Sequence, residues 1–114
     1  MSFDDDMARL RRAVDGLPEV MESTSYGTPS LKLGKKMLAR LREPGVVVLP
    51  CGSEDDKHML IEAAPDIYFT IAHYDGYPLV LARMDAISDA ELGHRLRLGW
   101  DFLATPKMKK AAGR

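Results

Sequence analysis

The chain has 114 residues, which suits a single domain with one hydrophobic core and is too short for two. Its composition, 46% hydrophobic and 29% charged, is that of a folded globular protein and excludes a disordered one. The formal net charge of −1 indicates no strong overall attraction to nucleic acid, and no apolar run approaches the roughly 18 residues of a membrane span.

The first ten residues, MSFDDDMARL, are acidic where a secretory signal is basic and then apolar. The single cysteine, Cys51, excludes an intramolecular disulfide framework, so we expect a cytoplasmic protein. The same segment opens the first predicted helix, because acidic residues are favoured in a first turn and apolar residues follow at helical spacing. These apolar residues are Met7, Leu10, Val14 and Leu17.

Residues 20–42 favour β-structure, with a turn at Gly27 and Pro29 and a hairpin whose loop we expect at residues 34–36. A three-residue loop sets Leu33 against Met37 and separates apolar from basic residues. The apolar face collects Leu31, Leu33, Met37, Ala39 and Leu41. The other face collects Ser30, Lys32, Leu38, Arg40 and Arg42, with Lys35 and Lys36 at the tip. No acidic residue lies between Glu22 and Glu43, so we call this segment the basic hairpin.

Residues 46–50, VVVLP, are a predicted central strand, and Ser53 begins a helix that Pro65 ends. A second hairpin is predicted around Asp75-Gly76, where a two-residue turn sets Tyr74 against Tyr77. One face of this hairpin collects the core residues Ile67, Phe69, Ile71, Val80, Ala82 and Met84. The other face, which we expect to be only partly covered, collects Tyr68, Thr70, Ala72, Tyr74, Tyr77, Leu79, Leu81 and Arg83.

A capping box over residues 88–91 opens the last predicted helix, which ends before Pro106. Its apolar side holds Leu92, Leu96, Trp100 and Leu103. The order α-β-β-β-β-α-β-β-α predicts an α+β fold in which helices pack on one face of an antiparallel sheet. We expect a single domain over residues 1–105, followed by a basic tail over residues 106–114. A short charged end of this kind is usually not ordered.

Three stretches of the chain resemble the MmcQ/YjbR family of small bacterial proteins. They are LPEVMESTSYGTPSLKLGKKMLARL (17–41), AAPDIYFTIAHYDGYPLVLARMDAI (63–87) and GWDFLATPKM (99–108). The resemblance covers nearly the whole chain and implies a CyaY-like α+β fold. Family members are often labelled DNA-binding, because their sheet and projecting hairpins are likened to a double-wing surface. The family often has a basic residue in the HYxGYP turn, where this chain has Asp75.

The basic and aromatic residues predict a DNA-binding surface. Lysine and arginine bind phosphates without reading sequence, and tyrosine rings stack on unpaired bases. The expected phosphate-binding residues are Lys32, Lys35, Lys36, Arg40, Arg42 and Arg83. The expected aromatic contacts are Tyr26, Tyr68, His73, Tyr74 and Tyr77. As an alternative, the lysines protect a solvated hairpin edge, while the surface of Tyr26, Tyr74 and Tyr77 binds a protein or a small ligand without nucleic acid.

Catalysis is not predicted, since the chain has no GxxxxGK[ST], GxSxG or HExxH motif. Cys51 follows an apolar strand, where cysteine is usually buried and inert, which argues against a nucleophile pair with His73. Glu54, His58 and Glu62 share one side of a helix, but acids there also suit the helix dipole. We therefore expect a non-enzymatic, monomeric protein with no cofactor and no metal.

Overall fold

A computed structural model describes residues 2–113 of the chain. The helices in this part are α1 (Phe3–Ala13), α2 (Glu54–Ala63), the 3₁₀ turn η1 (Ala72–Tyr74), α3 (Asp89–Leu103) and α4 (Pro106–Ala111). The strands are β1 (Val20–Ser25), β2 (Thr28–Leu33), β3 (Lys36–Glu43), β4 (Val46–Pro50), β5 (Tyr68–Phe69) and β6 (Leu79–Arg83). Over the same residues, no helix is long and apolar enough to cross a membrane.

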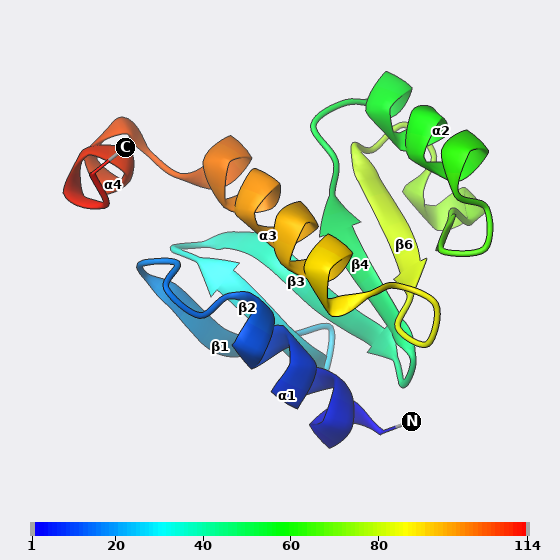
Figure 1. Ribbon diagram of the computed structural model, residues 1–114, viewed down its shortest axis with the longest axis horizontal. Helices are drawn as coiled ribbons and strands as arrows, with labels where there is room; N and C mark the ends of the chain where they lie inside the picture. Colours follow the sequence, from blue (N-terminus) through cyan, green and yellow to red (C-terminus); the bar gives the residue numbers. More distant parts are fainter. Residues whose placement is uncertain (1, 114) are drawn as a thin grey trace.

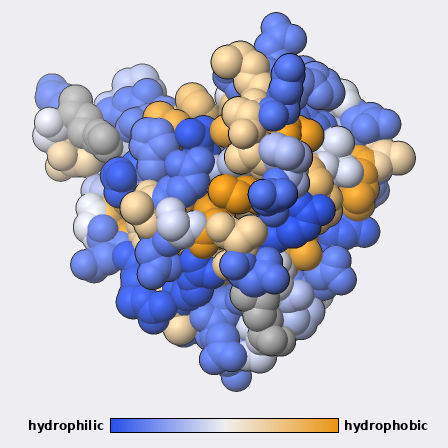
Figure 2. Space-filling model, turned by 45° about the vertical axis from the view of Figure 1, so that its right-hand side comes forward, coloured by the Kyte–Doolittle hydropathy of each residue, from blue (hydrophilic) through white to orange (hydrophobic). Residues whose placement is uncertain are grey.

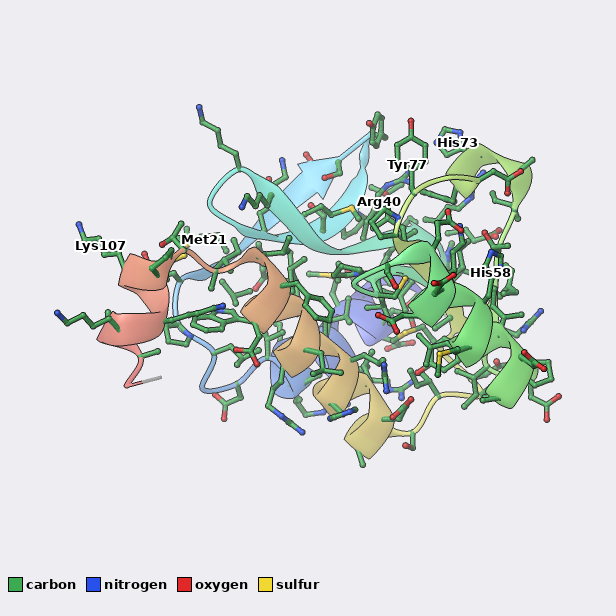
Figure 3. The ribbon with its side chains drawn as sticks, turned by 90° about the horizontal axis from the view of Figure 1, so that it is seen from above. Met21, Arg40, His58, His73, Tyr77 and Lys107 are labelled. Carbon is green, nitrogen blue, oxygen red and sulfur yellow. The ribbon has the colours of Figure 1, made fainter. Side chains whose placement is uncertain are left out.

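The strands form one antiparallel sheet in the order β1-β2-β3-β4-β6-β5. Helices α1 and α3 lie side by side over one face of this sheet, and α2 lies near β5 and β6 (Figure 1). The opposite face, which we call the open face, carries Arg40 and Tyr77 (Figure 3). This arrangement confirms the predicted α+β class, with helices packed on one face of an antiparallel sheet.

The helices α1 to α4 share one start signal, a hydroxyl side chain that accepts a hydrogen bond from the backbone N–H three residues later. These N-caps are Ser2, Ser53, Ser88 and Thr105. Such a cap satisfies a backbone donor that the helix leaves free and stabilises by about 1 kcal/mol. Thr105 thereby opens a helix within the expected basic tail, and Met108 of this helix packs against the core.

The core lies between the sheet and the helices α1 and α3. Leu10, Leu96 and Trp100 are fully buried there. Two long-range contacts fix the helices to the connecting segments. The Trp100 indole Nε1 donates to the Pro18 carbonyl at 2.9 Å. The Arg9 guanidinium donates to the carbonyls of Met84 and Ile87, so α1 is tied to the segment that precedes α3.

The basic hairpin differs from its prediction in its turn and in one face. Leu33 pairs with Lys36, so the loop has two residues, and a β-bulge then shifts the register between Lys32↔Met37 and Leu31↔Ala39. The bulge turns the consecutive residues Leu38 and Ala39 both into the core, while Met37 lies on the open face. Period-two alternation cannot anticipate this, because the extra residue inverts the faces on one side of the bulge only.

The second predicted hairpin is wrong in its strand register, although a turn does form at Asp75-Gly76, where the Tyr77 N–H donates to the Tyr74 carbonyl at 3.1 Å. Only Tyr68↔Ala82 and Phe69↔Leu81 pair, and residues 70–78 form a loop that contains η1. This register places Tyr68 in the helix-covered core and Phe69 on the open face, the reverse of the prediction for β5. On its other edge, β6 pairs with β4 from Pro50↔Leu79 to Val46↔Arg83. The backbone of β6 is therefore hydrogen-bonded along that edge without a long β5 strand.

Candidate functional site

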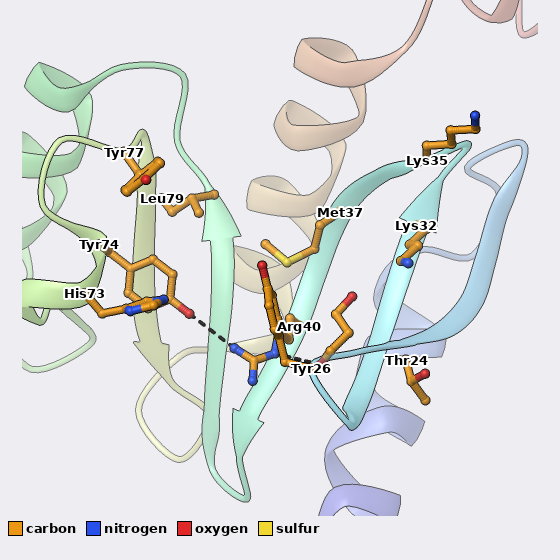
Figure 4. Close-up of a pocket in the computed structure, with 11 residues that line it drawn as sticks. Thr24, Tyr26, Lys32, Lys35, Met37, Arg40, His73, Tyr74, Tyr77 and Leu79 are labelled. Carbon is orange, nitrogen blue, oxygen red and sulfur yellow. Dashed lines mark hydrogen bonds between the residues drawn. The ribbon is translucent and has the colours of Figure 1, made fainter.

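The open face contains a hollow of about 670 Å³, which we call the trough. One wall comes from β1, β2, β3 and their turns, and the other from residues 73–77 (Figure 4). The apolar side chains Met37 and Leu79 lie between the two walls. The walls carry four aromatic residues, Tyr26, His73, Tyr74 and Tyr77. They also carry three cationic residues, Lys32, Lys35 and Arg40. Aromatic, basic and apolar groups from three strands, two turns and one loop therefore meet on one surface.

Tyr26 occupies an unusual backbone position at the turn between β1 and β2. Both Tyr26 (φ 54°) and Gly27 (φ 80°) have positive φ, and they join the paired residues Ser25 and Thr28 in a two-residue hairpin turn. Positive φ suits glycine and asparagine but strains a bulky residue. Tyr26 is 90% exposed, so burial does not offset this strain. Strained, exposed residues of this kind cluster at binding sites.

Arg40 connects the Tyr26 turn to the opposite wall of the trough. Its Nε donates to the Ser25 carbonyl at 3.1 Å and to Thr28 Oγ1 at 3.0 Å. Its Nη1 donates to the Tyr74 hydroxyl at 3.3 Å (Figure 4). The guanidinium carbon also lies 5.1 Å from the centroid of the Tyr26 ring, within cation–π range. Arg40 is thus a positioned cation that holds one side of the Tyr26 ring.

The opposite wall is built by the loop over residues 70–78, which a buried lysine holds in place. Lys57 of α2 is 1% exposed, and its Nζ donates to the Tyr74 carbonyl at 2.7 Å and to the Tyr77 carbonyl at 3.2 Å. Within this loop, the Tyr74 side chain is buried. The His73 ring lies edge-on to the Tyr74 ring, with 4.8 Å between the two centroids. Tyr77 remains 58% exposed and lines the trough. The exposed ring therefore stands on a fixed backbone.

The structure brings seven of the predicted contact residues to the trough, and separates the others from it. Arg42 lies beside it, in a hollow of about 450 Å³ that also contacts Tyr26 and Arg40. Lys36 points to the helix-covered side, where its Nζ reaches the Leu103 carbonyl at 3.4 Å. Arg83 lies over the Phe69 ring at 4.3 Å and donates to carbonyls of residues 65 and 66.

The prediction of Tyr68 as a surface contact is wrong. Tyr68 is 1% exposed, and its hydroxyl donates to Glu91 Oε2 at 2.5 Å. Burial raises the pKa of this hydroxyl, and the hydrogen bond to Glu91 raises it further. The β5 register is the physical reason, because it turns Tyr68 toward α3. Sequence reasoning also missed Lys57, whose neighbours Asp55 and Asp56 make it look like part of a solvated helix surface.

A second type of hollow lies between α2 and α3, with a volume of about 340 Å³. Figure 2 shows hydrophobic surface near the middle of one side of the molecule, with hydrophilic side chains around it. Met59, Leu60 and Phe102 give the hollow a mainly apolar lining.

Across residues 2–113, no group of three or more His, Cys, Asp and Glu side chains is placed to hold a metal ion.

The thiol of Cys51 is expected to be unreactive in the folded protein. It is buried, and burial raises its pKa to about 11 from the ordinary value of 9.0. We expect iodoacetamide at pH 8 to alkylate it roughly 100-fold more slowly than in the urea-unfolded chain, since each pKa unit costs tenfold in thiolate. Mass spectrometry of timed samples measures both rates. Equal rates would show that the thiol is accessible and ionised in the folded state.

The fold and the trough together define a class of protein. It is a small α+β domain with helices on one face of an antiparallel sheet and basic and aromatic residues on the open face. The YjbR family model matches residues 15–102, and the chain belongs to the YjbR family. The resemblance predicted from the sequence is therefore confirmed.

Uncharacterized proteins from Mycobacterium tuberculosis (strain H37Rv) and Mycobacterium bovis are each 30% identical to the chain. Each alignment is 125 residues long and covers 94% of this chain and 92% of the relative. The crystal structure of a Deinococcus radiodurans protein with the domain DUF419 is similar at a TM-score of 0.72. That likeness has 21% sequence identity and covers 98% of this chain and 88% of the other. At this identity it supports the fold.

Proposed function

We propose that this protein is a non-enzymatic nucleic-acid-binding protein, with DNA as the expected ligand, and that the trough is its binding surface. The observation that carries the proposal is the meeting of exposed tyrosines and cations on the open face. Tyr26 and Tyr77 offer rings, while Lys32 and Lys35 offer ammonium groups on the same surface. Such a combination of stacking platforms and phosphate-binding cations is typical of nucleic-acid-binding grooves.

The local charge supports this proposal better than the net charge does. The trough lining contains Lys32, Lys35 and Arg40 but no carboxylate. Its described lining also has no thiol, and the His73 ring stands edge-on against the Tyr74 ring. General acid–base catalysis uses a positioned pair of such groups, so the lining favours binding over catalysis.

A second candidate function is the binding of a protein segment or a small ligand without nucleic acid. The volume of the trough, about 670 Å³, lies in the range of roughly 300–1,000 Å³ that small-molecule sites occupy. Its apolar side chains Met37 and Leu79 suit such a ligand. This candidate predicts weak dependence of affinity on salt, whereas phosphate binding predicts a strong one.

Neutralising the two lysines of the trough is expected to weaken DNA binding. In a Lys32→Ala/Lys35→Ala variant, the slope of log affinity against log salt should become shallower by about 1.4–1.8, because each lost phosphate contact removes about 0.7–0.9. Fluorescence anisotropy with labelled random-sequence DNA, titrated from ~50 to ~200 mM salt, measures this slope.

The matched control is a Lys107→Ala/Lys109→Ala variant, which removes the same charge from α4. It should bind DNA as the unmodified protein does. Equal loss in the two variants would mean that total charge, and not the trough, drives binding. No binding of any DNA at ~50 mM salt, where phosphate contacts are strong, would refute the proposal and favour the second candidate.

A further inference from the structure

We infer that the trough takes an unpaired nucleic-acid strand, with bases stacked on Tyr26 and Tyr77, and that it discriminates against duplex DNA. This inference rests on the proposed nucleic-acid function and names the form of the ligand.

The Tyr26 ring is arranged as a platform. The Arg40 guanidinium carbon lies 5.1 Å from the ring centroid, and the residue remains 90% exposed. Arg40 is itself fixed by Ser25 and Thr28, so the ring is supported from the rigid sheet. A supported, open ring gains stacking energy from a base whose own face is free. In a duplex the base faces are already stacked on each other, and only edges and backbone are presented.

The second platform and the apolar side chains support the same conclusion. Tyr77 stands on the opposite wall, 58% exposed, on backbone that Lys57 holds. Met37 and Leu79 lie between the two walls (Figure 4). A duplex exterior of sugars and phosphates cannot remove these apolar groups from water, whereas unpaired bases inserted between the walls can.

The charge of the trough is one-sided. Lys32 and Lys35 lie on the β2–β3 side, and residues 70–78 of the other wall contain Asp75 but no lysine or arginine. Arg40 is already engaged with Ser25 and Tyr74. Cations on one wall suit the binding of a single sugar–phosphate backbone. A duplex would bring its second backbone toward the loop over residues 70–78, which has no lysine or arginine. Two lysine contacts also predict a modest salt slope, near −1.4 at about 0.7 for each contact with a single strand.

The test compares three fluorescein-labelled ligands of ~12 nucleotides in anisotropy titrations: a thymidine single strand, a duplex, and an abasic strand that keeps the phosphates without the bases. We expect the single strand to bind at least about tenfold more tightly than the duplex and the abasic strand. An equal or higher affinity for the duplex or the abasic strand would overturn the inference and leave phosphate binding intact. Absence of binding by all three at ~50 mM salt would overturn the proposed function as well.

A Tyr26→Asn variant separates binding from folding. Asparagine accepts positive φ and forms a favoured Asn-Gly hairpin turn, so the thermal midpoint should stay unchanged or rise. Single-strand affinity should nevertheless fall about 5- to 150-fold, the effect of losing one stacked base. A Tyr77→Ala variant should show a similar loss, and Tyr26→Phe and Tyr77→Phe should retain binding because the rings remain. Unchanged single-strand affinity in both Tyr26→Asn and Tyr77→Ala would overturn the inference.

Discussion

A Trp100→Ala variant is expected to lose about 3–5 kcal/mol of unfolding free energy, the range for removing a buried large aromatic side chain. Trp100 is fully buried in α3 and packs in the main core cluster. Its Nε1 also donates to the Pro18 carbonyl, 82 positions away in the sequence, which ties α3 to the connection between α1 and β1. Urea denaturation followed by circular dichroism at the helical minimum measures the change without relying on tryptophan fluorescence.

The matched control for this variant is Phe102→Ala, two positions further along the same helix. Phe102 is 49% exposed, so truncation of its side chain should cost only about 1 kcal/mol. A Trp100→Ala protein as stable as the Phe102→Ala protein would contradict the packing of α3 on the sheet described above.

Replacement of Lys57 by methionine is expected to cost about 1–3 kcal/mol, the cost of leaving a buried acceptor without a donor. The Tyr77 carbonyl loses its donor, whereas the Tyr74 carbonyl keeps the Tyr77 N–H. Methionine keeps much of the apolar side-chain length but cannot donate to the carbonyls of Tyr74 and Tyr77, which Lys57 reaches at 2.7 and 3.2 Å. The loop over residues 70–78 then loses these two hydrogen bonds to α2. Urea denaturation measures the global cost.

Hydrogen exchange detects the local effect of Lys57→Met. The amides of Tyr74 and Tyr77 are hydrogen-bonded within the loop, to Ile71 and Tyr74 respectively, and should exchange faster in the variant. Amides of β3 should keep their protection. His58→Ala serves as the control, because its side chain is 67% exposed and its loss should change stability by less than about 0.5 kcal/mol. Loop protection that survives in Lys57→Met would show that other contacts hold the wall of the trough.

Local signals were enough to predict most of the architecture. Hydroxyl caps at Ser53 and Ser88 begin α2 and α3 where the sequence indicates, and the β-branched run of residues 46–50 forms a strand inside the sheet. Each of these signals acts over a few residues, through one hydrogen bond or one face of a helix, so a single stretch of sequence contains all of the relevant chemistry. The α+β class followed from the order of such segments.

The candidate site was predicted only in its chemical composition. The sequence indicated that Tyr26, Tyr74, Tyr77 and the lysines of the basic hairpin matter, since aromatic residues clustered around turns and an acid-free basic stretch are visible in the sequence. It did not indicate that Tyr74 is buried. It did not indicate which of them meet. Lys36 and Lys35 are adjacent in the chain, yet Lys35 lines the trough and Lys36 reaches the end of α3. A turn of two residues, not three, decides this separation.

The amino-acid sequence by itself determined the starts of α2 and α3, the central strand, the family and the residue types of the open face. Only the tertiary structure decided the bulge that buries Leu38 beside Ala39, the burial of Tyr68, and the loop held by Lys57. The physical reason is the range of the interactions. Caps and periodicity act between near neighbours, whereas a bulge, a strand register and a buried ammonium group depend on partners that only the packed sheet and helices bring together.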